Sequence, residues 1–129
     1  MTSFGALRTP RKIIFGKGQR GALGVAAKSL GGRAFVCTDA RLAADRDFTA
    51  MVDDLKRSGL SVLVYDRTVP ELPLSGIADC VEAAKAFGPD IVIGIGGGSC
   101  MDLAKAAAVM LAHGGDVRSY YGEFQVPGP

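Results

Sequence analysis

The chain has 129 residues, of which 48% are hydrophobic and 22% charged, values typical of a globular protein large enough to bury a core. Its net charge is only +2 and no basic cluster is interleaved with aromatics, so we expect no nucleic-acid partner. There is no signal-peptide pattern and no apolar run near the ~20 residues of a membrane helix, and the three cysteines are dispersed, so we expect no membrane partner and a cytoplasmic protein with reduced thiols.

Four short apolar runs have the length and composition of β-strands. None alternates cleanly between apolar and polar residues, which is typical of strands covered on both faces. The runs are residues 13–15, 34–37, 62–65 and 91–93.

Apolar residues recur at helical spacing in residues 23–30, 48–55 and 77–87, and a further helix is expected at 100–112. Each of the first three helices is followed by a pair that contains glycine and ends it. The fourth is apolar nearly all round, so we expect it to be buried. This alternation predicts one α/β domain over residues 1–129, a parallel sheet flanked by helices on both faces.

The strand-to-helix turn before the last helix carries the strongest chemical signal. Gly96, Gly97 and Gly98 have no Cβ atoms to cover their backbone N–H groups, and the positive end of the helix dipole lies beside them. Together these features favour a bound phosphate, although a tight structural turn is the alternative. Ser99 and Asp102 have the spacing of a capping box, a structural role compatible with anion binding.

A second glycine turn, at residues 16–21, also fits the G-x-G-x-x-G spacing of a dinucleotide site. The strand before this turn is short, and Gln19 and Arg20 do not suit a closely packed helix start. We therefore prefer the turn at 96–99 as the phosphate site. Asp39 ends the second strand, near the spacing at which an acidic residue holds a ribose hydroxyl. Ribose binding and capping of the next helix are equally supported for Asp39.

Three residues near the last helix are expected to have structural roles. We expect Cys100 to pack as a small apolar side chain, and we prefer this interpretation to that of a reactive thiol. Lys105 is expected to be solvated. His113 is the single histidine, lies at a helix C-terminus where a cationic side chain is favourable, and lacks partners for a catalytic or metal site.

The string Ile-Gly-Gly-Gly-Ser-x-x-Asp-x-x-Lys at residues 95–105 resembles the signature loop of the iron-containing alcohol dehydrogenase family. The order of other features agrees: a Phe-Gly-x-Gly turn, a strand ending in Thr38 and Asp39, and a Val-Pro pair at 69–70. The resemblance covers essentially the whole chain. It implies a Rossmann-like dinucleotide-binding domain. Because the Asp39 carboxylate repels a 2′-phosphate, NAD is expected in preference to NADP.

The resemblance also implies six cofactor-binding residues and no catalytic residue within this chain. One accepts hydrogen bonds from the adenosine ribose, the glycine turn holds the pyrophosphate, and an acidic residue of the last helix lies beside the cofactor. In chain order they are Asp39, Gly96, Gly97, Gly98, Ser99 and Asp102.

Two departures from the family pattern bear on function. Many members carry an Asn-Pro pair after the Val-Pro, where this chain has Glu71, so the contact of this loop with adenosine is open. Members bind a divalent metal, iron or zinc, through an aspartate and three histidines in a carboxyl-terminal helical domain. This chain has one histidine and ends in a loop-like segment at 125–129, so we expect the natural protein to continue and this part alone to be inactive.

The sequence is therefore interpreted as the cofactor-binding half of an NAD-dependent alcohol dehydrogenase for a small alcohol or aldehyde, a homo-oligomer at full length. The metal would polarise the substrate oxygen while hydride passes to or from nicotinamide. Two alternatives are a stand-alone nucleotide-binding module without catalysis and a dehydroquinate synthase-like lyase. Ser99 and Lys105 argue against the lyase.

Overall fold

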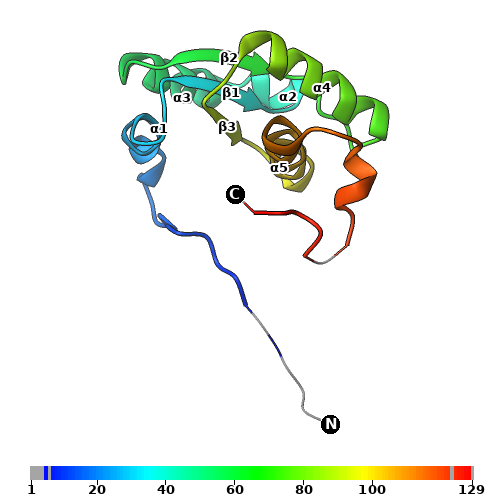
Figure 1. Ribbon diagram of the computed structural model, residues 1–129. Helices are drawn as coiled ribbons and strands as arrows, with labels where there is room; N and C mark the ends of the chain where they lie inside the picture. The colour runs from blue at the N-terminus through cyan, green and yellow to red at the C-terminus, as the bar shows by residue number, and fades with distance from the viewer. Residues whose placement is uncertain (1–4, 6, 123, 129) are drawn as a thin grey trace.

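Three parallel strands form the centre of the molecule, in the order β2-β1-β3 (Figure 1). The computed structural model describes residues 5, 7–122 and 124–128. The strands are β1 (Arg33–Cys37), β2 (Ser61–Tyr65) and β3 (Ile91–Gly94). The helices are α1 (Leu23–Lys28), α2 (Ala40–Ala43), α3 (Arg46–Arg57), α4 (Leu74–Phe87) and α5 (Gly98–His113), with short 3-10 helices η1 (Gln19–Ala22) and η2 (Val117–Tyr120). No helix in these described ranges is long and apolar enough to cross a bilayer.

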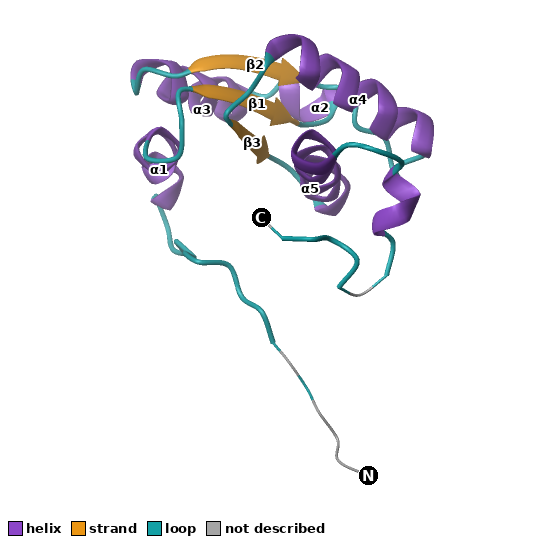
Figure 2. Cartoon of the chain, viewed as in Figure 1, coloured by secondary structure: helices purple, strands orange, loops and turns teal. Residues whose placement is uncertain are grey.

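The side chains of β1 alternate between the two faces of the sheet, and each face is covered by helices. Ala34 and Val36 pack in the cluster formed with α1 and α3, whereas Phe35 and Cys37 pack with α4 and α5. All four side chains are fully buried. Figure 2 shows α1 and α3 on one side of the strands and α4 and α5 on the other. The predicted α/β fold, a parallel sheet flanked by helices, is confirmed.

Local sequence signals set the ends of the helices. The carboxylate of Asp45 accepts a hydrogen bond from the Asp47 N–H at 2.8 Å and caps the start of α3. Gly88 ends α4 in the left-handed conformation, with φ of 68°, which costs glycine little. α3 ends at Arg57, directly before the pair at 58–59, and α4 ends at Phe87, directly before the pair at 88–89, so both predicted C-terminal ends are confirmed.

Two expectations from the sequence are wrong. Residues 13–15 form no strand, and Phe15 is 96% exposed. An apolar run becomes a strand only where a neighbour satisfies its backbone groups, and no described strand pairs with this one. α5 is buried on one face and not all round: Leu103 and Ala107 lie in the core, but Met101 is 46% exposed. A helix packed on one side of a sheet buries a single stripe of its surface.

Backbone hydrogen bonds join the loops that leave the three strands at their carboxyl ends. The Ile95 N–H donates to the Cys37 carbonyl at 3.0 Å, and the Thr38 N–H donates to the Tyr65 carbonyl at 2.9 Å. The Thr68 N–H reaches the Thr38 carbonyl at 3.3 Å. Because β2 and β3 lie on opposite sides of β1, the chain leaves β1 and β3 in different directions, and a crevice opens between their loops.

Candidate functional site

The loops after the three strands enclose a small pocket of about 220 Å³ at the carboxyl edge of the sheet. Four of the six residues predicted to bind the cofactor line this pocket, together with five residues from the same loops. The predicted four are Asp39, Gly97, Gly98 and Ser99, and the others are Arg41, Thr68, Val69, Pro70 and Cys100. Segments far apart in the sequence therefore meet where open α/β sheets bind ligands.

The start of α5 forms one wall of the pocket. Gly97 precedes the helix, and no side chain caps its N-terminus. The first helical hydrogen bond runs from the Met101 N–H to the Gly97 carbonyl at 3.1 Å, so the N–H groups of Gly98 and Ser99 have no helical partner. These amides at the positive end of a 16-residue helix suit an anion. The capping box expected of Ser99 and Asp102 is wrong, because the helix begins before Ser99 and places it inside the first turn.

The three glycines of the turn have different roles. Gly96 has φ of +141°, and a Cβ atom there would come within 2.8 Å of Cys100 Sγ and 2.9 Å of Leu42 Cδ1. A Cβ atom at Gly97 or Gly98 would instead enter open space. Gly96 therefore shapes the turn and lines a neighbouring groove, whereas Gly97 and Gly98 leave room for a ligand against the backbone.

Asp39 combines a structural contact with a place on the pocket wall. Its Oδ1 accepts a hydrogen bond from the Leu42 N–H at 2.8 Å and caps α2, so the capping role is confirmed. Its Oδ2 has a weak contact with Cys100 Sγ at 3.8 Å, and a ligand hydroxyl would be a stronger donor to this oxygen. One carboxylate can therefore cap the helix and bind a ligand at the same time.

Cys100 lies beneath the turn and is 2% exposed. Burial raises the pKa of its thiol, and the negative charge of Asp39 raises it further. Burial beneath the turn agrees with the expected role of Cys100 as a small apolar side chain.

Thr68 is a site residue that the sequence analysis missed. Two buried hydroxyl oxygens in the described residues, Thr38 Oγ1 and Thr68 Oγ1, have no nitrogen or oxygen partner. Buried polar groups are nearly always hydrogen-bonded. The Thr68 hydroxyl has only the Cys100 thiol as a weak partner, so a polar ligand atom at the pocket would be a stronger one. Thr68 lines the pocket and Thr38 does not. The sequence shows that a threonine precedes the Val-Pro pair, but it does not show that this threonine is buried, because burial depends on tertiary packing.

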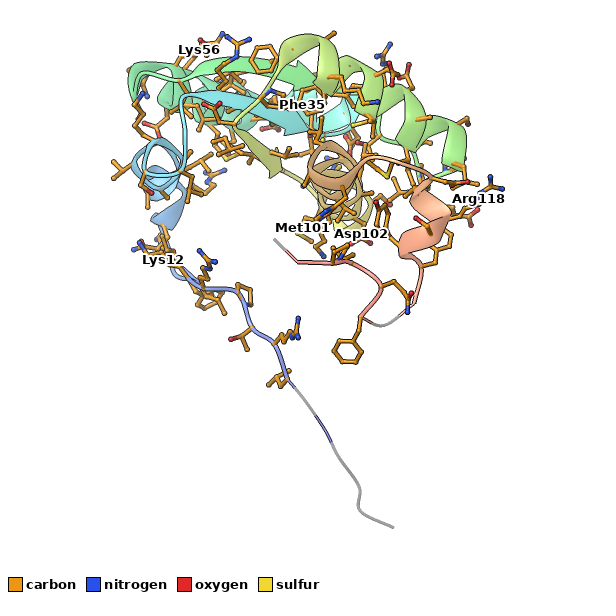
Figure 3. All side chains as sticks on the ribbon, in the orientation of Figure 1. Lys12, Phe35, Lys56, Met101, Asp102 and Arg118 are labelled. Atoms are coloured by element: carbon orange, nitrogen blue, oxygen red, sulfur yellow. The ribbon has the colours of Figure 1, made fainter. Side chains whose placement is uncertain are left out.

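Asp102 lies outside the pocket. Its carboxylate is exposed and accepts a hydrogen bond from Lys105 Nζ, one turn along α5, at 3.2 Å. Figure 3 shows Asp102 on the side of α5 away from the sheet, next to Met101. The expected solvation of Lys105 is confirmed, since its side chain is 76% exposed.

The earlier glycine turn borders a separate groove. Gly16 and Gly18 have φ of 139° and 81°, and the turn leads into the four-residue helix η1 and not directly into a long α-helix. Gly16 lines a groove of about 620 Å³ that also includes Gly96 but does not include Asp39. This turn therefore lacks both the helix start and the acidic residue that the smaller pocket combines.

The residues described do not fit a metal ion. Within residues 5, 7–122 and 124–128, no group of three or more His, Cys, Asp or Glu is arranged to hold one. The buried thiols of Cys37 and Cys80 lie 3.8 Å apart, but two ligands are too few for a typical site. His113 lies at the end of α5 with Nε2 2.9 Å from the Gly128 carbonyl. The pocket thus offers backbone amides that suit an anion, together with hydroxyls and a carboxylate that suit the hydroxyl groups of an organic ligand.

Sequence comparison relates the chain to a known family. The family model for iron-containing alcohol dehydrogenases matches residues 10–129. A sulfoacetaldehyde reductase of Bilophila wadsworthia is 36% identical over 94% of this chain and 32% of its own length. A 1,3-propanediol dehydrogenase of Citrobacter freundii is 31% identical over 88% of this chain and 30% of its own.

Solved structures place the fold in the same group. An NADH-dependent butanol dehydrogenase A of Thermotoga maritima superposes with a TM-score of 0.84 at 28% identity, over 96% of this chain and 32% of that one. The chain therefore spans about a third of the length of these relatives. Because the family model matches nearly all of its residues, the chain belongs to the iron-containing alcohol dehydrogenase family.

Proposed function

We propose that this domain binds NAD(H) in the pocket at the carboxyl edge of the sheet, as the cofactor-binding part of an alcohol oxidoreductase. The observation that carries the proposal is the meeting of three groups at one pocket: the uncapped amides of α5, the Asp39 carboxylate and the buried Thr68 hydroxyl. The butanol dehydrogenase relative, whose name states NADH dependence, supports the choice of cofactor.

Each group suits one part of a dinucleotide. The N–H groups of Gly98 and Ser99 donate to the pyrophosphate oxygens, because both are unpartnered and lie at the positive end of α5. Asp39 Oδ2 accepts from a hydroxyl of the adenosine ribose. When bound, nicotinamide accepts or donates hydride in the interconversion of an alcohol and an aldehyde. In this proposal, the divalent metal and most substrate contacts belong to the part of the family enzymes that this chain does not span.

The test replaces Thr68 with valine, which has the same shape and no hydroxyl. Titration calorimetry with NAD should show a loss of affinity of about tenfold, the effect of one buried hydrogen bond. The melting temperature of the ligand-free variant should change little, because the hydroxyl that is removed has only the weakly hydrogen-bonding Cys100 thiol as its partner.

Thr38→Val is the matched control. It removes the other buried, unpartnered hydroxyl, which does not line the pocket, and it should leave NAD affinity unchanged. Two results would show that this pocket is not the cofactor site. One is that the folded original chain binds no NAD, and the other is that the Thr68 variant and the original bind NAD with equal affinity.

A further inference from the structure

A carboxylate and a guanidinium share the rim of the pocket. Asp39 and Arg41 both line it, from the end of β1 and the second position of α2. Arg41 is exposed and forms no ion pair with any described residue, whereas Arg20 and Arg57, for example, each pair with an aspartate of α3. Arg41 is therefore a positive group at the pocket that has no negative partner among the residues that the structure describes.

The position of Arg41 is set by Asp39. The hydrogen bond from the Leu42 N–H to Asp39 Oδ1 fixes the start of α2, and Arg41 lies between these two residues. The same bond leaves Oδ2 as the Asp39 oxygen that is more available to a ligand. A ribose at Asp39 would consequently lie within the region that the long Arg41 side chain borders.

We propose that Arg41 is a specificity-determining residue that binds a 2′-phosphate on the adenosine ribose, so that the site accepts NADP(H) as well as NAD(H). The inference rests on the proposed binding of a dinucleotide in this pocket. The Asp39 carboxylate alone would repel a 2′-phosphate. A guanidinium on the same rim offsets that repulsion and donates two parallel hydrogen bonds to phosphate oxygens.

The proposal predicts how the two cofactors respond to salt. NADP carries the additional phosphate, and the Arg41 side chain is exposed, so the attraction between them is screened as ionic strength rises. The affinity for NADP should therefore fall more steeply with added salt than the affinity for NAD. The steeper fall should disappear when Arg41 loses its charge.

The experiment is calorimetric titration of NAD and NADP into the original chain, Arg41→Gln and Arg46→Gln. Arg46 is a matched control, because it is an exposed arginine of the neighbouring helix, forms no ion pair with a described residue and does not line the pocket. Arg41→Gln should weaken NADP binding by about tenfold more than it weakens NAD binding, as expected when charge-assisted hydrogen bonds to the 2′-phosphate are lost. Arg46→Gln should alter neither affinity.

The outcomes separate this inference from the proposed function. If the original chain binds NAD but not NADP, or if Arg41→Gln and the original bind NADP equally, the role of Arg41 is wrong and the NAD site stands. If the native chain binds neither dinucleotide, the proposed function is wrong and the inference falls with it.

Discussion

Gly96 and Gly97 are neighbours in the sequence, yet only Gly96 has a backbone conformation that other residues rarely adopt. Gly97 has φ of −79° and ψ of −169°, an extended conformation open to any residue. The sequence pattern alone does not distinguish the glycines of this turn. In the structure, folding depends on the first glycine, and the space for a ligand depends on the second and third.

Gly97→Val is therefore expected to abolish NAD binding with little loss of stability. The branched side chain enters the open space where the pyrophosphate approaches, and the backbone conformation accepts it. Titration calorimetry and thermal melting on the same samples check the two parts. A valine variant that binds NAD with the original affinity would exclude this wall of the pocket.

Gly96→Ala is the contrasting variant. Its Cβ would meet Cys100 and Leu42 in a strained conformation, so the free energy of unfolding should fall by about 1–3 kcal/mol. Urea denaturation measures this loss. Equal stability of the Gly96 and Gly97 variants would contradict the division of roles.

Asp39→Asn separates the two contacts of Asp39. Asparagine is as good an N-cap as aspartate, so α2 and the melting temperature should be preserved. The loss of negative charge should raise the affinity for NADP relative to NAD, because repulsion of the 2′-phosphate is removed. Asp39→Ala, which also loses the cap, should be about 1 kcal/mol less stable than Asp39→Asn. An unchanged ratio of the two affinities would show that Asp39 does not approach the ribose.

At the scale of elements, α5 links the core to the pocket. Its buried stripe packs against the sheet while its first turn presents amides to the ligand. Gly94 allows this contact, because a Cβ atom there would lie 2.9 Å from Met101 Cα and 3.0 Å from Ala104 Cβ. The position of the amides thus depends on close packing between β3 and α5.

Two truncations on α5 test which face is buried. Leu103→Ala removes a side chain that is 2% exposed and should lower the free energy of unfolding by about 2–5 kcal/mol. Met101→Ala, on the exposed side, should cost less than about 1 kcal/mol. Denaturant unfolding of both variants is the measurement. A similar fall in the free energy of unfolding for both variants would indicate that α5 is buried on all sides.

At the scale of the whole molecule, the fold keeps several weak acids neutral. Burial raises the pKa of Cys100 and of Tyr65. The hydrogen bond between Cys37 and Cys80 raises the pKa of Cys37, an effect to which burial adds, and lowers the pKa of Cys80. A group whose pKa is higher in the folded than in the unfolded chain favours folding below its unfolded pKa. That contribution is lost as the pH rises towards the folded pKa.

The free energy of unfolding is therefore expected to fall as the pH rises above about 8.5, where thiols of the unfolded chain ionise. Urea denaturation at pH 7, 9 and 10 measures it. Cys100→Ala removes one of these acids and should show a shallower decline than the original chain. A parallel decline in both proteins would mean that the Cys100 thiol ionises alike in the folded and unfolded states.

The sequence by itself determined the α/β class, three of the four predicted strands, the four longer helices and the glycine turn. Each follows from local periodicity and from backbone groups close together in the chain. Tertiary structure decided that Thr68 and Arg41 join Asp39 at one pocket, that Asp102 faces away, that α5 is buried on one side and that residues 13–15 form no strand. These outcomes depend on which distant segments pack together, and a strand or a buried hydroxyl is defined by neighbours that the local sequence does not contain.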